Sequence, residues 1–316
     1  MADSLTLDLP ADADLHVLVP SAALGEALER LSPRVHAHRI DPADGPPTGE
    51  AAAAQVWVPG GGASIPDGFL AGLPGLKLVQ LMSAGAENFV GKLPDGVVLC
   101  NARGAHTPAT AEWVLAATLA AQRGIPDFVR EQDAGRWSFG TRHSLVGARV
   151  LFVGAGDIAR TVAAMMAPFA ITPTFVASRA RDRVHGIDAL PQLLGDAHVV
   201  VVLVPVTDST RGLVGPEFLE AMADDALLVN AARGVVVDTD ALLAELTSGR
   251  LRAALDVTDP EPLPEGHPLW SAPGLLLTPH VAGAVPETTE RATAAVSDQL
   301  ERVLAGRPLA NVVDQY

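Results

Sequence analysis

Cysteine and long apolar segments are both scarce in this chain, and each absence excludes a class of protein. Cys100 is the single cysteine in 316 residues, so an intrachain disulfide is impossible. Because Cys100 ends an apolar run, we expect a small buried side chain and not a nucleophile. No apolar run is long enough to span a bilayer, and the acidic segment Met1–Pro10 is unlike a signal peptide. We therefore expect a cytoplasmic protein without a membrane partner.

Positive charge is scarce as well. The chain has 22 lysine and arginine residues against 37 aspartate and glutamate residues, which gives a formal net charge of −15. Nucleic-acid binding requires a basic face that neutralises phosphates, so a nucleic-acid partner is not expected. No spacing of potential ligands is typical of a metal site. Hydrophobic residues make up 48% of the chain, which argues against disorder, and its length is enough for two domains.

The first part of the chain alternates apolar, strand-like runs with helical or turn segments. Ser21–Leu31 places leucines at helical spacing, and Asp41–Gly49 is rich in residues that favour turns. This alternation predicts a small, flavodoxin-like α/β domain. Its expected strands are Leu15–Val19, Arg34–His38, Gln55–Val58, Lys77–Leu81 and Val97–Cys100.

A second α/β domain is expected to begin near Ala148. Val199–Val204 is apolar at every position, which is typical of a parallel strand covered on both faces. Helices are expected between the strands, at Ile158–Met166, Pro216–Met222 and Thr239–Thr247. The pattern predicts a doubly wound parallel sheet of the Rossmann type. Its expected strands are Arg149–Val153, Pro173–Ala177, His198–Val204, Leu227–Ala231, Arg252–Val257 and Leu275–Thr278.

Two helices are expected at the joins between the domains. One begins at Thr107-Pro108, with threonine as its cap and proline in its first turn, and runs to about Gln122. The less regular segment Arg123–Ser144 is interpreted as an arm or loop. Pro286–Leu304 is predicted to be one long helix that returns the chain to the first domain. The expected domains are residues 1–102 with 286–316, and residues 103–285.

A glycine-rich turn follows the first strand of the second domain. Gly154 permits a tight turn, and Gly156 allows the backbone to approach a pyrophosphate. The amides of Asp157 and Ile158 open the next helix, where phosphate binds. Ala159 stands where the full dinucleotide-binding motif has its third glycine, a position that requires only close helix–strand packing. The strand–turn–helix context predicts a dinucleotide site, although an ordinary glycine turn has a similar local sequence.

The segment after the next strand bears on which dinucleotide binds. An NAD site places an acidic residue there to hold the ribose hydroxyls. This chain has Ser178, Arg179 and Arg181 instead, and a guanidinium suits a 2′-phosphate. We therefore expect NADP(H) to be preferred, with NAD(H) possible. The alternative is that these arginines only form a solvated surface turn.

Three residues after later strands suggest the chemistry. Arg233 follows one strand end, His280 follows another, and Glu261 lies in a loop bracketed by prolines. Active sites of open α/β sheets lie at the carboxyl ends of strands. A guanidinium can hold a carboxylate and polarise a carbonyl, an imidazole can transfer the proton, and a carboxylate can stabilise the imidazolium. Taken singly, an arginine or histidine at such a place is more often structural. Together with the glycine turn, they predict a nicotinamide-dependent oxidoreductase of 2-hydroxy acids.

Over nearly its whole length the chain resembles the D-isomer-specific 2-hydroxyacid dehydrogenases, in motif order as well as residue type. The resemblance implies that His280 is the acid/base, that Glu261 is its partner and that Arg233 binds the substrate. It also implies a homodimer formed through the cofactor domains and the arm. The matching segments are Gly154–Ala159, Thr207–Val214, Asn230–Asp238, Ala254–Trp270 and Thr278–Gly283.

The same resemblance implies further contacts. Asp256 would bond the nicotinamide carboxamide, and Thr110 would line the nicotinamide side of the cleft. The amides of Ala84 and Gly85 would take the substrate carboxylate, which makes residues 1–102 and 286–316 the substrate-binding domain. Departures from the family pattern are Ala159, Thr258 where an aromatic is common, and Leu203 where many relatives have histidine.

The segment Met82–Glu87 and the Ser-Arg ribose turn look most like the glyoxylate/hydroxypyruvate reductase branch. The expected activity is reduction of small 2-oxo acids to D-2-hydroxy acids by hydride transfer from NAD(P)H. Two alternatives remain. One is an NAD-linked phosphoglycerate dehydrogenase, although Pro59–Ile65 offers no cation for a phosphate. The other is a dinucleotide-sensing binding protein like the family's corepressors. We expect neither the tails of such a corepressor nor the regulatory domain common in the first.

Overall fold

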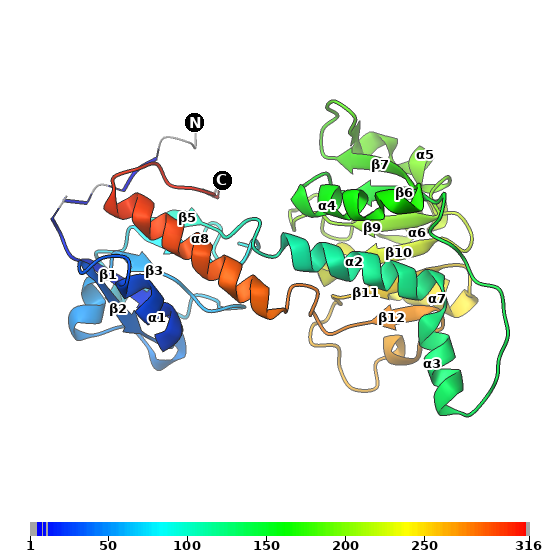
Figure 1. Cartoon of the computed structure of the whole chain (residues 1–316), viewed down its shortest axis with the longest axis horizontal. Helices are drawn as coiled ribbons and strands as arrows, with labels where there is room; N and C mark the ends of the chain where they lie inside the picture. Colours follow the sequence, from blue (N-terminus) through cyan, green and yellow to red (C-terminus); the bar gives the residue numbers. More distant parts are fainter. Residues whose placement is uncertain (1–4, 8, 11, 314–316) are drawn as a thin grey trace. The chain divides into compact units, whose positions relative to one another are not determined.

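The computed structural model describes residues 5–7, 9–10 and 12–313 and divides the chain into two compact units (Figure 1). Unit 1 consists of Met1–His106 and Val285–Tyr316, and unit 2 of Thr107–Ala284. Each unit is built on one sheet in which neighbouring strands pair in parallel. The α/β class expected from the sequence is confirmed. The domain limits and the roles attached to them stay predictions.

The sheet of unit 1 has the strand order β2-β1-β3-β4-β5. This is the order of flavodoxin-like sheets, in which the chain reverses direction of winding next to the first strand. The register pairs Leu15 with Val35 and Leu78 with Val98, so strand starts are aligned at one edge. The strands are β1 (Leu15–Val19), β2 (Val35–Arg39), β3 (Val56–Trp57), β4 (Leu78–Gln80) and β5 (Val98–Cys100).

Helices cover one face of this sheet. α1 (Ala22–Glu29) and α8 (Pro286–Leu304) pack against the face that carries the odd-numbered residues of β1. On α8, the orange-to-red helix in Figure 1, Val296, Leu300 and Val303 recur at helical spacing. All three are buried in this core. The opposite face is covered by loops and short turns, and there the ring of Trp57 packs against that of Phe69 in a tilted arrangement. The long C-terminal helix therefore belongs to the core of unit 1.

The sheet of unit 2 has seven strands in the order β12-β11-β10-β9-β6-β7-β8. Counted from β6, this is the Rossmann order with one added strand. The order reverses between β6 and β9, and ligands of open α/β sheets bind outside the strand ends at such a point. The strands are β6 (Arg149–Val153), β7 (Thr172–Ala177), β8 (His185–Gly186), β9 (Val199–Val202), β10 (Leu227–Asn230), β11 (Arg252–Leu255) and β12 (Leu275–Leu277).

Both faces of the second sheet are covered, as the apolar run at β9 predicts. Val199 and Val201 contribute to one core with α2 and α4, while Val200 and Val202 contribute to the other with α5, α6 and α7. All four valines are buried, because successive strand residues point to opposite faces. The helices of this unit are α2 (Thr107–Gln122), α3 (Ile125–Asp133), α4 (Asp157–Met166), α5 (Leu190–Leu194), α6 (Pro216–Ala221) and α7 (Thr239–Ser248).

The structure corrects several local expectations. The segment interpreted as an irregular arm contains α3, whose apolar residues Ile125 and Val129 lie at helical spacing but stay exposed. Thr107 is the first residue of α2 and not its cap. β8 and α5 were not expected, because two- and five-residue elements are too short for periodicity to show. Short 3-10 helices lie at Pro42–Asp44, Gly49–Ala53, Leu70–Gly72, Ala167–Phe169, Ile187–Ala189, Gly234–Val236 and Pro268–Ser271.

Among the described residues, none of the helices combines the length and the apolar character that crossing a membrane requires.

Candidate active site

The glycine turn connects β6 to α4 at the switch point of the second sheet. The amide of Gly154 donates to Val176 at 2.8 Å, and its φ of +115° is a conformation that favours glycine. A Cβ at this position would lie 2.3 Å from the carbonyl oxygen of Leu203, so a side chain is excluded sterically as well. Because it has no side chain, Gly154 lets the chain turn at the end of β6 in close contact with the backbone of Leu203, which follows β9.

The N-terminus of α4 faces open space. Gly156 precedes the helix, and a Cβ added there would meet nothing within 4 Å. Asp157 and Ile158 are the first two helical residues, so their amides have no partner within the helix. Ala159 is fully buried in the core between α4 and the sheet. Its small side chain permits the close packing that the third position of the motif requires.

The arginine-rich turn begins where β7 ends, at Ala177. Ser178, Arg179 and Arg181 are exposed, and Arg181 also forms a small backbone bridge with Val184. The guanidinium of Arg181 donates from Nη2 to the carbonyl of Ala155 at 3.4 Å. The turn thus carries positive charge to the edge of the glycine turn, where the ribose end of a dinucleotide would lie.

Arg233 lies in a loop that a buried asparagine shapes. Asn230 ends β10, and its side chain accepts from the amide of Ala232 at 2.9 Å and donates to the carbonyl of Arg233 at 3.0 Å. The Arg233 guanidinium donates to the carbonyl of Ala232 at 2.8 Å. Sequence reasoning did not select Asn230, although an amide side chain closing an apolar strand is a signal that could have found it.

Glu261 and His280 are in contact, although they come from separate loops. His280 Nδ1 lies 2.5 Å from Glu261 Oε1, and the two side chains are 46% and 39% exposed. Because Glu261 engages Nδ1, Nε2 is the ring nitrogen that can meet a substrate. The peptide bonds that precede Pro260 and Pro262, on either side of Glu261, are both cis. The pair has the arrangement of an acid/base histidine with a carboxylate partner.

Asp256 organises the loop that carries His280. Its carboxylate is 2% exposed and accepts from the Thr278 hydroxyl at 2.6 Å and from the amides of Val281 and Ala282, each at 2.8 Å. The carbonyl of Asp256 accepts from the amide of His280 at 2.7 Å. The sequence did not indicate this structural role. The expected contact of Asp256 with the nicotinamide carboxamide stays a prediction.

A pocket lies beside the Glu261–His280 pair within unit 2. Its volume is about 260 Å³. Leu263, Trp270 and Leu277 form its apolar wall, while Asp256, Glu261 and His280 line it with polar atoms. Such a mixture of apolar walls and a few convergent polar groups is typical of small-molecule sites.

The remaining expected residues lie in different units. Thr110 is buried on α2 in unit 2. Ala84 and Gly85 follow β4 in unit 1, where their carbonyls accept from Asn101 at 2.9 Å and from Ser83 at 3.0 Å. These two bonds give the loop a defined shape. The roles expected for Thr110, Ala84 and Gly85 stay predictions.

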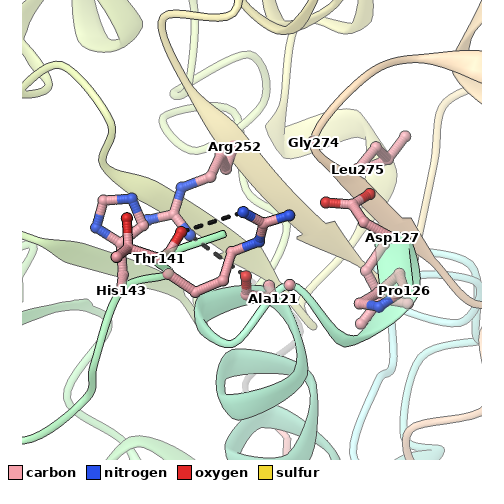
Figure 2. A pocket seen from close by; sticks show the side chains of 11 residues that line it. Ala121, Pro126, Asp127, Thr141, His143, Arg252, Gly274 and Leu275 are labelled. Carbon is pink, nitrogen blue, oxygen red and sulfur yellow. Dashed lines mark hydrogen bonds between the residues drawn. The ribbon is translucent and has the colours of Figure 1, made fainter. Parts of the chain in front are cut away.

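A second pocket, of about 340 Å³, lies in unit 2 where β11 begins, and Figure 2 shows its lining residues. Asp256 follows the other end of that strand. Arg252 donates there to Gln122 Oε1 and to the carbonyl of Asp225, each at 2.8 Å. Burial lowers the pKa of the Arg252 guanidinium, and burial likewise lowers the pKa of His143 beside it. Figure 2 shows His143 and Thr141 next to Arg252. This pocket plays no part in the arrangement of His280 and Glu261.

Comparisons with known proteins by family model, by sequence and by structure point to the same family. The family model described as "D-isomer specific 2-hydroxyacid dehydrogenase, NAD binding domain" matches residues 115–282. The chain is similar to glyoxylate/hydroxypyruvate reductase B of Yersinia enterocolitica, with 32% identity over 81% of this chain and 82% of the relative. It is also 32% identical to the glyoxylate reductase of Aeropyrum pernix, over 77% of each chain.

Solved structures show the same similarity in three dimensions. A D-isomer specific 2-hydroxyacid dehydrogenase from Xanthobacter autotrophicus, in complex with NADPH and MES, has a TM-score of 0.82 and 32% identity, covering 96% of this chain and 98% of that one. The NADPH-dependent glyoxylate/hydroxypyruvate reductase of Sinorhizobium meliloti, in complex with NADP and malonate, has a TM-score of 0.79 and 26% identity, with the same coverage.

Proposed function

The chain belongs to the D-isomer specific 2-hydroxyacid dehydrogenase family, and on that premise we propose that it reduces small 2-oxo acids such as glyoxylate and hydroxypyruvate to D-2-hydroxy acids. It is an NAD(P)-dependent oxidoreductase. The observation that supports this reaction most directly is the contact between His280 and Glu261 in the chain's second, Rossmann-type unit. Two relatives that are each 32% identical to this chain are named as a glyoxylate/hydroxypyruvate reductase and a glyoxylate reductase.

When bound, the nicotinamide would supply the hydride that the carbonyl carbon of a 2-oxo acid accepts. His280 donates the proton to the carbonyl oxygen from Nε2, as a general acid. Glu261 at Nδ1 orients the ring and stabilises its protonated form. Arg233 holds the substrate carboxylate and stabilises the negative charge that develops on the carbonyl oxygen.

The cofactor is proposed to be NADP(H), with NAD(H) accepted. Amides of the glycine turn and of the first turn of α4 would hold the pyrophosphate. Ser178, Arg179 and Arg181 would receive the ribose 2′-phosphate, since no carboxylate stands at the end of β7 to repel it. Asp256 and Thr110 would contact the nicotinamide end. Similar proteins have been solved with NADPH and with NADP.

Unit 1 is proposed to bind the substrate carboxylate through the amides of Ala84 and Gly85. We also expect a cytoplasmic homodimer formed through the cofactor-binding units and the arm. The arm exposes Trp137 completely and Phe139 to 92%, and two large aromatic side chains in water favour burial against a second copy. Sedimentation of the purified protein tests the dimer, and a monomer at micromolar concentration would contradict it.

The test of the activity is a panel of initial rates. Glyoxylate, hydroxypyruvate, pyruvate and phosphohydroxypyruvate are each offered with NADPH and with NADH. His280→Ala serves as the matched variant: we expect kcat to fall by roughly a hundredfold or more while cofactor binding is retained. A near-normal kcat in this variant would show that His280 is not the acid. Strong preference for the phosphorylated substrate, or no turnover of any 2-oxo acid, would contradict the proposed function.

A further inference from the structure

We propose that Thr239, the first residue of α7, is a positioning residue that holds Glu261 against His280. The hydroxyl of Thr239 donates to the carbonyl of Asp259 at 2.7 Å. Asp259 lies two residues before Glu261, in the loop formed by residues 258–262. The inference deepens the proposed function, on which it rests, because it concerns the geometry of the proposed proton donor.

The loop 258–262 has few hydrogen bonds of its own. Two of its five residues are prolines, which have no amide hydrogen, and the Thr258 hydroxyl bonds within the loop to Pro260 at 2.9 Å. Among the described residues, the hydrogen bonds that tie the loop to other parts of the chain are those of Thr239 to Asp259 and of Glu261 to His280. Thr239 is therefore the polar anchor that does not take part in the chemistry.

A steric contact holds the same loop one residue earlier. Gly234 is buried, and a Cβ built on it would lie 1.8 Å from the carbonyl oxygen of Thr258 and 2.7 Å from the amide nitrogen of Asp259. The backbone of Gly234 thus lies directly against the loop. Gly234 also follows Arg233, so the segment that presents the guanidinium supports the loop that presents Glu261.

The segment that bears Thr239 is itself well fixed. Asp238 caps α7 by accepting from the amide of Ala241 at 2.9 Å, and the amide of Asp238 donates to the carbonyl of Val214 at 3.0 Å. Thr239 is half-buried, next to this cap. Its hydroxyl is therefore a fixed donor that holds the Asp259 carbonyl in place. Since both Glu261 and His280 are partly exposed, the loop's backbone must supply much of the order that the pair needs for proton transfer.

The experiment compares Thr239→Val, which keeps the shape and removes the hydroxyl, with Thr239→Ser, which keeps the hydroxyl. Thr247→Val is the control, because Thr247 lies exposed on the same helix and donates to Leu243 at 2.7 Å. We expect Thr239→Val to lower kcat roughly tenfold with an unchanged Kd for NADPH, because misplacing a catalytic group costs rate more than binding. The serine variant and the control should stay close to the wild type.

A double-mutant cycle with Glu261→Gln separates positioning from general destabilisation. If Thr239 acts through Glu261, Thr239→Val should cause little further loss of kcat in the Glu261→Gln background. Losses that multiply in full would overturn the inference, as would a valine variant with the kcat of the wild type.

A measurement without substrate keeps this test independent of the activity. In protein labelled with ¹⁵N-histidine, the Nδ1 resonance of His280, assigned with His280→Ala, reports the contact with Glu261. Thr239→Val should move it toward its position in Glu261→Gln, whereas Thr239→Ser should not. An unmoved resonance overturns the positioning role. Failure of the wild type to reduce 2-oxo acids would instead overturn the proposed function.

Discussion

Replacing Gly234 by alanine tests whether the close approach of two backbones sets the geometry of the catalytic residues. The added Cβ would lie 1.8 Å from the carbonyl oxygen of Thr258 and 2.0 Å from its carbon. Nonbonded atoms do not approach this closely, so the Thr258 carbonyl must retreat by roughly 1 Å or more. The loop that follows leads to Glu261, whose contact with His280 spans only 2.5 Å. A displacement of that size therefore cannot leave the pair unchanged.

Two magnitudes follow from this displacement. A misplacement of about 1 Å in a catalytic group costs on the order of a hundredfold in rate, and kcat of Gly234→Ala should fall accordingly. Overpacking a buried site costs about 1–3 kcal/mol of unfolding free energy. For a unit of this size, each kcal/mol lowers Tm by about 2–4 °C. The variant should thus lose most of its turnover while it is still folded at assay temperature.

The assay measures kcat with the best 2-oxo acid, Kd for NADPH and the thermal midpoint. Gly195→Ala is the control, because its Cβ would meet only Ala221 at 3.7 Å, an ordinary contact, and its φ of −65° suits alanine. Gly195→Ala should match the wild type in all three quantities. If Gly234→Ala retained the kcat of the wild type, the loop would have an easy route to accommodate the methyl group. The reasoning from backbone contact to catalytic geometry would then be refuted.

Three further predictions concern the cofactor, the cysteine and pH. Arg179→Ala should lower kcat/KM for NADPH at least roughly tenfold relative to NADH, because a charge-assisted bond to the 2′-phosphate is lost. Arg183→Ala is the control. Equal losses of kcat/KM with both cofactors would exclude this role for Arg179. Burial raises the pKa of the Cys100 thiol to about 12, so Ellman's reagent at pH 8 should react only after unfolding, and rapid native reaction would contradict this. Burial, and then the nearby His16, lower the pKa of His38 below its usual 6.5. Neutral His38 therefore contributes stability that is present above pH 6.5 and is lost as the pH falls below it. Between pH 7.5 and 5.5, the free energy of unfolding measured with urea should fall less for His38→Gln than for the wild type. An identical fall would refute this.

Local patterns in the sequence were enough to predict the fold class. β1, β6 and α8 begin and end at the residues expected, because period-two and helical spacing are properties of neighbouring positions. The unbroken apolar run at β9 correctly indicated a strand with helices on both sides. The glycine turn could be placed after β6 for the same reason, since strand, turn and helix are contiguous. α3 was missed although Ile125, Phe128 and Val129 lie at helical spacing, because a helix of nine residues is too short for that spacing to stand out and the helix buries none of its residues.

The sequence also determined which residues could carry the chemistry. Arg233, Glu261 and His280 were selected because their types and motif context suit reduction of a 2-oxo acid, and their roles stay predictions. The sequence alone did not show which contacts hold the loops that carry these three residues. Gly234, Thr239 and the second role of Asp256 act through residues more distant in the sequence.

Only the tertiary structure decides such contacts. Parallel strands bring the loops after β10, β11 and β12 to one edge of the sheet, and there a side chain of one segment bonds to the backbone of another. Every residue except proline offers the same backbone donor and acceptor, so the pairing of these groups is not visible in residue type. A glycine shows that a close approach is permitted, and the packed sheet shows which backbone makes it.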